Sequence, residues 1–173
     1  IKAKKFSSIG IETGKVTLNL SQMMKIKEKS VTVLTKGVEF LLKKNKVDYI
    51  KGKASLKSNT EIIVEENKSK KVYAAKNIVI STGSLPTSLP EMQIDEKNIV
   101  SSTGALSFNQ VPKKLIIIGG GSIGLEMGSV WKRLGSDVTI IEFLDHIITG
   151  ADMEISKEFL KILTKQGIIF KLN

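Results

Sequence analysis

A run of large apolar residues leads directly into three consecutive glycines in the segment KKLIIIGGGSIGLEMGSVWKRLG, residues 113–135. Gly119, Gly121 and Gly124 form the pattern G-x-G-x-x-G between an expected strand and an expected helix. Gly119 permits the tight turn, Gly121 lets backbone approach a pyrophosphate, and Gly124 lets the helix lie close to the strand. Because the N–H groups at a helix start attract anions, the segment predicts a dinucleotide-binding turn.

The next apolar run, SDVTIIE, ends at Glu142. This residue follows Gly121 by about 20 positions, the spacing of the acid that binds an adenosine ribose in such folds. The competing interpretation is an exposed glutamate at a strand end. A carboxylate repels the 2′-phosphate of NADP, and residues 143–146 carry no fixed positive charge, so we expect NAD. His146, the only histidine, is interpreted as a polar loop residue, because no catalytic or metal-ligand set accompanies it.

Strands and helices alternate beyond residue 112, and this pattern predicts an α/β fold with a parallel sheet and right-handed crossovers. The expected strands are 114–118, 138–142 and 168–172, and the expected helices are about 122–134 and 152–166.

The first half of the chain has a different periodicity. Apolar residues recur at helical spacing in 21–45, which predicts one long amphipathic helix with Ser21 as its N-cap. Short β-rich runs then extend over 47–83 and predict a β-meander that ends in a buried strand, NIVISTG. All three prolines lie in 84–112, which we interpret as a connector rather than sheet.

Composition narrows the function classes. The formal charge is +10, from 27 basic and 17 acidic residues, but the sole arginine is Arg133 and the lysines are scattered. Solvated surface lysine is therefore favoured over a nucleic-acid partner, and a lysine-rich RNA-binding protein is kept as an alternative. Cysteine is absent, so this chain can form no disulfide. We expect no membrane partner, because no apolar run approaches 18 residues and no signal-peptide pattern precedes the first helix.

The order of motifs closely resembles that of the dihydrolipoamide dehydrogenase family of flavoprotein disulfide reductases. The resemblance covers essentially the whole chain and is carried by NIVISTGS, SSTGALS, the glycine segment, SVWKRLGSDVT and DMEISKEF. It implies parts of two Rossmann-like dinucleotide-binding domains in an FAD/NAD-linked reductase fold. Residues 1–83 resemble the later part of an FAD-binding domain, and residues 113–173 resemble the first part of an NAD-binding domain.

The resemblance also implies site residues. The matching FAD contacts are Ala54, Thr82, Gly83 and Ser84. The matching NAD contacts are Gly119, Gly120, Gly121, Ser122, Ile123, Gly124, Leu125, Glu126 and Glu142, with Glu126 directed toward the nicotinamide and flavin. The family's redox-active cysteine pair and its His–Glu pair would lie before Ile1 and after Asn173. We therefore expect no catalytic residue and no metal ligand in this chain.

The whole enzyme implied by the resemblance oxidises protein-bound dihydrolipoamide through a redox-active disulfide and FAD, and it reduces NAD. Its implied partners are the lipoyl domains of 2-oxo acid dehydrogenase complexes and a second copy of itself, in the bacterial cytoplasm or the mitochondrial matrix. Because the sequence begins at Ile1 rather than Met, we interpret it as part of a longer chain. We expect this part to be inactive alone, because it has no cysteine that could accept electrons from a dithiol. The alternatives are another flavoprotein disulfide reductase and a noncatalytic NAD-binding module.

Overall fold

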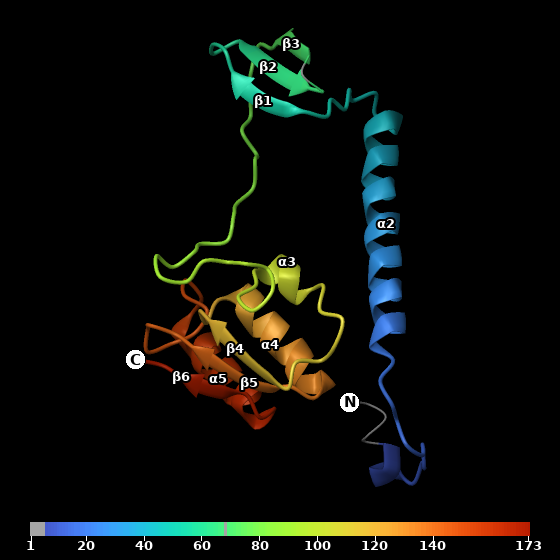
Figure 1. Cartoon of the computed structure of the whole chain (residues 1–173), viewed down its shortest axis with the longest axis vertical. Coiled ribbons are helices and arrows are strands. Elements are labelled where there is room, and N and C mark those ends of the chain that lie inside the picture. Colours follow the sequence, from blue (N-terminus) through green and yellow to red (C-terminus); the bar gives the residue numbers. More distant parts are fainter. Residues whose placement is uncertain (1–5, 68) are drawn as a thin grey trace. The chain divides into compact units, whose positions relative to one another are not determined.

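The structure is a computed structural model, and it describes residues 6–67 and 69–173 (Figure 1). The chain divides into two compact units. One unit comprises Lys27–Leu85, and the other joins the residues before Lys27 to Pro86–Asn173. The division falls within α2 (Leu20–Lys44).

The unit that contains the C-terminus is built around a parallel sheet in the order β4-β5-β6. Its elements alternate along the chain as β4 (Lys114–Ile118), α4 (Ser122–Leu134), β5 (Asp137–Ile141), α5 (Met153–Lys165) and β6 (Ile169–Lys171). The predicted α/β alternation is confirmed, and each element lies within a few residues of its expected position. The glycine segment joins β4 to α4, as the apolar run before it predicts.

The core of this unit lies on one face of the sheet. The buried side chains are contributed by α4, β5, α5 and the loops around them: Leu125, Val138, Ile140, Ile147, Leu163 and Ile168. Gly128 permits close packing, because a Cβ there would lie 3.0 Å from Cδ1 of Ile117. On the opposite face of the sheet, Ile116 and Ile118 of β4 are exposed. Burial of each large aliphatic side chain in the core contributes roughly 1.5–3 kcal/mol.

The segment before β4 contains one short helix, α3 (Ser102–Ala105), which the connector interpretation did not anticipate. Ser101 caps it by accepting a hydrogen bond from the Thr103 N–H at 3.2 Å. Phe108 follows the helix and packs against buried Trp131 of α4, with ring centroids 5.3 Å apart. These contacts attach the end of the segment to α4. In the described residues, the only β-bridge within the segment joins Leu89 to Met92, so the segment is a connector and adds no strand to a sheet.

The other unit holds an antiparallel meander of β1 (Lys53–Leu56), β2 (Glu61–Glu66) and β3 (Ser69–Ala74). The long helix and the three central strands of the predicted meander are confirmed, but the cap of α2 is Asn19 rather than Ser21. The Asn19 side chain accepts from the Gln22 N–H at 2.9 Å, which leaves Ser21 inside the first turn.

Two expected strands of the meander do not form. Residues 47–52 and 77–83 have no strand assignment, and the apolar Val79 is 87% exposed rather than buried. β-propensity alone does not make a strand, because each strand needs a hydrogen-bonded partner. Within the described residues, β2 pairs with β1 and β3, and no pairing is formed by the 77–83 run.

Among the helices of the described residues, none has the length and apolar character that crossing a bilayer requires.

Candidate dinucleotide-binding site

The three glycines 119–121, called the glycine turn below, lie at the carboxyl end of β4. Gly119 has φ +103°, in the left-handed region that favours glycine, and its N–H donates to the Ile141 carbonyl at 2.8 Å. A Cβ at Gly124 would lie 2.8 Å from the Gly119 carbonyl oxygen. The two outer glycines of the pattern are therefore required by the turn and by the close approach of α4.

The N-cap residue of α4 makes no side-chain hydrogen bond to the first turn of the helix. Gly121 is the N-cap, with extended backbone, and it supplies no side chain to the helix N–H groups. By contrast, Asp152 at the start of α5 accepts from the Glu154 N–H at 2.8 Å. A Cβ on Gly121 would meet no atom within 4 Å, so the space beside this glycine is open. An uncapped helix start beside open space is suited to a phosphate group.

Glu142 lies directly beside this turn. Its Oε2 accepts from the Gly120 N–H at 2.6 Å, and its Oε1 accepts from the Leu144 N–H at 2.9 Å. These backbone donors, Gly120 first, hold the pKa of the half-buried Glu142 carboxyl below its usual range, against the opposing effect of desolvation. The carboxylate is therefore held in its charged form at the carboxyl end of β5.

The remaining predicted residues of this site lie in the first turns of α4. The side chains of Ser122, Ile123 and Glu126 are exposed, whereas Leu125 is 1% exposed and belongs to the core. The Leu125 N–H donates to the Gly121 carbonyl at 3.1 Å, so it is engaged within the helix. The structure thus brings the glycine turn and Glu142 together and directs Leu125 away from solvent.

The residues expected to contact FAD lie in the other unit. Ala54 pairs with Val64 in the meander, and the exposed Thr82–Ser84 segment follows β3 without strand pairing. Gly83 has φ +76°, which is consistent with a tight turn that requires glycine. The contacts of these residues with FAD stay predictions.

The loop after β5 contains two contacts that the sequence did not reveal. Buried Ile147 lies under the glycine turn, and the Ile148 N–H donates to the Gly120 carbonyl at 2.8 Å. The available signal was the second adjacent apolar pair of the loop, Ile147 and Ile148, which follows Asp145 and His146. Nearby, His146 Nδ1 lies 2.7 Å from Asp145 Oδ1, and this contact lowers the pKa of the Asp145 carboxyl. No cluster that could hold a metal was found among the residues with described positions.

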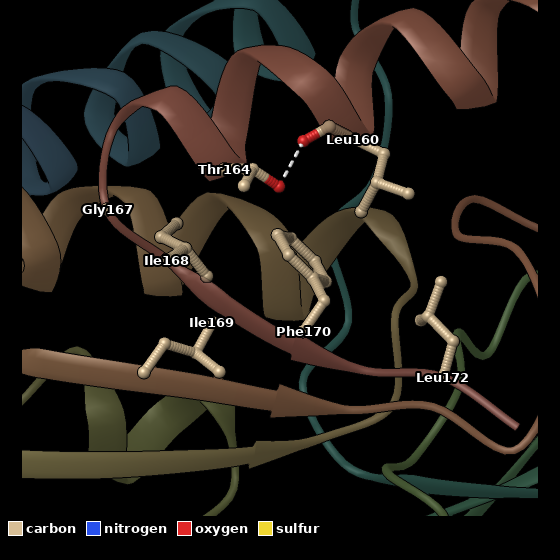
Figure 2. A pocket seen from close by; sticks show the side chains of 7 residues that line it. All are labelled: Leu160, Thr164, Gly167, Ile168, Ile169, Phe170 and Leu172. Carbon is tan, nitrogen blue, oxygen red and sulfur yellow. Dashed lines mark hydrogen bonds between the residues drawn. The ribbon is translucent and has the colours of Figure 1, made fainter.

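An apolar groove lies elsewhere, between the end of α5 and β6 (Figure 2). Its lining residues are Leu160, Thr164, Gly167, Ile168, Ile169, Phe170 and Leu172. The Thr164 hydroxyl donates to the Leu160 carbonyl at 2.8 Å, the bond drawn in Figure 2. None of the predicted site residues lines this groove.

Comparison with known families decides the class of this fold. A profile of the pyridine nucleotide-disulphide oxidoreductases matches residues 3–173. This chain belongs to the pyridine nucleotide-disulphide oxidoreductase family. The predicted resemblance to flavoprotein disulfide reductases is confirmed at the level of family. The cofactors of this family are FAD and a pyridine nucleotide, NAD or NADP.

Curated relatives carry dehydrogenase names. The chain is 56% identical over 168 residues to dihydrolipoyl dehydrogenase 3 of Pseudomonas putida, covering 96% of this chain and 36% of the relative. It is 58% identical over 164 residues to a dihydrolipoamide dehydrogenase of Chaetomium thermophilum, covering 94% and 32%. It is also 53% identical to the mitochondrial dihydrolipoyl dehydrogenase of Dictyostelium discoideum, covering 97% and 35%. The chain therefore spans about a third of the length of these relatives.

Solved structures support the same fold. LpdA from Mycobacterium tuberculosis superposes with a TM-score of 0.87 at 20% identity, over 99% of this chain and 38% of that one. The HOCl-induced flavoprotein disulfide reductase RclA from Escherichia coli superposes with a TM-score of 0.74 at 29% identity, over 90% and 36%. The predicted fold class, parts of the Rossmann-like domains of an FAD/NAD-linked reductase, is thereby confirmed.

Proposed function

We propose that this chain carries the NAD-binding turn and part of the FAD site of a dihydrolipoyl dehydrogenase. The relatives with 53–58% identity bear that enzyme's name or its synonym, and the family match spans nearly the whole chain. The structural observation that supports the proposal is the 2.6 Å hydrogen bond from Gly120 to Glu142, because it puts a carboxylate directly beside an uncapped glycine turn.

The residues present fit NAD better than NADP. The open space beside Gly121 admits a pyrophosphate, and the start of α4 has no side-chain cap that would compete for its N–H groups. Glu142 retains free lone pairs that can accept from the ribose hydroxyls, and its negative charge opposes a 2′-phosphate. Asp145, with a side chain that is 81% exposed, adds a second negative charge in the same loop.

In the complete protein, the dithiol of dihydrolipoamide is oxidised to a disulphide, and NAD⁺ is reduced to NADH with release of a proton. FAD supplies the hydride-transfer chemistry between the two when it is bound. This chain contributes positioning to that reaction. Residues 119–126 and Glu142 orient NAD, and Ala54 with Thr82–Ser84 contact FAD.

The proposal includes the partners and the location of the enzyme. A dihydrolipoyl dehydrogenase acts on lipoyl domains of 2-oxo acid dehydrogenase complexes and forms a homodimer. Relatives occur in a bacterium and in mitochondria, so we propose the bacterial cytoplasm or the mitochondrial matrix as its location.

Another flavoprotein disulfide reductase is the second candidate, and the likeness to RclA at 29% identity favours it. One assay separates the two. The complete protein is purified, its flavin absorbance is recorded, and dihydrolipoamide-dependent reduction is measured with NAD and with NADP. Turnover with NAD supports the proposal, whereas a flavoprotein that turns over only other disulfide substrates supports the second candidate. A colourless protein that binds NAD without turnover would establish the noncatalytic module.

A further inference from the structure

The peptide groups around Gly120 are held from both sides by the loop that follows β5. The Gly120 N–H donates to Glu142 at 2.6 Å, and the Gly120 carbonyl accepts from the Ile148 N–H at 2.8 Å. A Cβ at Gly120 would lie 3.0 Å from Cγ2 of Ile147, so this side of the turn is also in close packing. The loop 142–148 therefore encloses the middle of the glycine turn.

One residue of the loop 142–148 has a strained backbone conformation in this arrangement. Ile148 has φ +49°, a conformation that β-branched residues rarely adopt and that costs of order 1–3 kcal/mol. In that conformation its N–H meets the Gly120 carbonyl. At the other end of the loop, Glu142 Oε1 accepts from the Leu144 N–H at 2.9 Å, which anchors the carboxylate within the loop itself.

We propose that Glu142 is a positioning residue for the glycine turn, so that recognition of the ribose and recognition of the pyrophosphate are coupled through Gly120. This inference rests on the proposed function, because it concerns how the same site receives NAD. A carboxylate that only accepted ribose hydroxyls would have no need of the Gly120 N–H. Here the same carboxylate also accepts from the Gly120 N–H, and this bond orients the turn.

The first experiment needs no nucleotide. Hydrogen exchange at the Gly120 amide is measured by mass spectrometry with residue-level fragmentation in the complete protein and in the Glu142→Gln variant. A carboxamide has one acceptor oxygen, so it can serve only one of the Gly120 and Leu144 N–H groups. Since a hydrogen bond to a charged group contributes about 1.5–3 kcal/mol, we expect Gly120 exchange to accelerate at least about 10-fold. Unchanged exchange at Gly120 and Leu144 would overturn the positioning role whether or not NAD binds.

The second experiment separates positioning from ribose recognition. The dissociation constants of NAD and of its analogue with 2′,3′-dideoxyadenosine, which lacks both ribose hydroxyls, are measured for the wild type and for Glu142→Gln. If Glu142 positions the turn, the variant weakens binding of the 2′,3′-dideoxy analogue about 10-fold as well, in line with one lost charged hydrogen bond. A loss confined to NAD would overturn the inference.

Two variants keep these measurements decisive. Asp145→Asn removes the same charge from the same loop without a bond to Gly120, and we expect wild-type exchange at Gly120 from it. Glu142→Asp keeps the charge but shortens the side chain, so it should reproduce the faster exchange even if the Gln variant folds poorly. Failure of the wild type to bind NAD would overturn the proposed function, while the exchange data would still decide the positioning role.

Discussion

A Cβ on Gly124 would lie 2.8 Å from the carbonyl oxygen of Gly119, a separation that real Cβ atoms essentially never show. The close approach joins the start of α4 to the turn that precedes it. Both atoms belong to backbone or are fixed to it, so neither can move aside without displacing the helix. Glycine at position 124 is consequently a requirement of packing, before any nucleotide is considered.

This contact predicts the behaviour of Gly124→Ala. We expect destabilisation by about 1–3 kcal/mol, the usual range for overpacking, and a lowered Tm in thermal unfolding of the complete protein. Gly37→Ala is the matched control, because Gly37 lies in α2 with nothing within 4 Å of its expected Cβ. The control should keep or slightly raise the Tm, since alanine favours helices. Equal Tm values for both variants would contradict the packing argument.

Gly121→Val should behave in the opposite way. Gly121 has φ −76° and open space at its Cβ, so stability should change little. The isopropyl group would occupy the space proposed for the pyrophosphate, and NAD binding should weaken by about 3 kcal/mol, or more than 100-fold. Calorimetric titration with NAD measures this, and the flavin content should be unchanged. An unaltered NAD affinity would remove the glycine turn from the proposed site.

Glu142→Arg should shift the cofactor preference. The guanidinium cannot accept from the ribose hydroxyls, but it offers a charge-assisted partner to a 2′-phosphate. The ratio of kcat/KM for NAD to that for NADP should fall by about 100-fold, or roughly 3 kcal/mol. Steady-state assays of the complete protein with both nucleotides give this ratio. If the wild-type preference for NAD is retained in full, another residue sets the specificity.

The lowered pKa of Glu142 predicts how its contribution to stability depends on pH. Because the folded pKa lies below the unfolded value, the stabilisation is fully present above the ordinary glutamate pKa of about 4.3 and is lost as pH falls through the folded pKa. Carbon-13 NMR of labelled glutamate carboxyls can follow this group, assigned by the signal missing from Glu142→Gln. Titration at or above the ordinary value would contradict the hydrogen bonds from Gly120 and Leu144.

The 173-residue chain alone should show no dihydrolipoamide dehydrogenase activity and should retain little FAD. It contains no cysteine, so it has no disulfide that could accept electrons from a dithiol. Exposed apolar side chains such as Val79, Ile80 and Ile116 should also promote aggregation. Lipoamide-dependent NAD reduction, assayed after removal of free flavin, measures the activity. Turnover by this chain without other protein would refute the assignment of the electron-accepting groups to other segments.

The local pattern was sufficient for the parallel sheet and its helices. Each sequence signal used here lies within a few neighbouring residues: the apolar run before Gly119, the glycine spacing and the position of Glu142. The observed bounds of β4, α4 and β5 agree closely with the bounds that these signals predicted. The meander was also predictable, because its three strands pair with their neighbours in sequence.

Tertiary structure decided the features that depend on distant partners. Residues 77–83 have strong β-propensity but lack a strand partner among the described residues, so their conformation could not follow from sequence alone. The hydrogen bond from Gly120 to Glu142 joins residues 22 positions apart. The unfavourable φ of Ile148 accompanies a hydrogen bond from its N–H to the Gly120 carbonyl, which is also distant in the sequence. Periodicity and spacing report local preference, whereas such contacts form only after the sheet has brought the ends of β4 and β5 side by side.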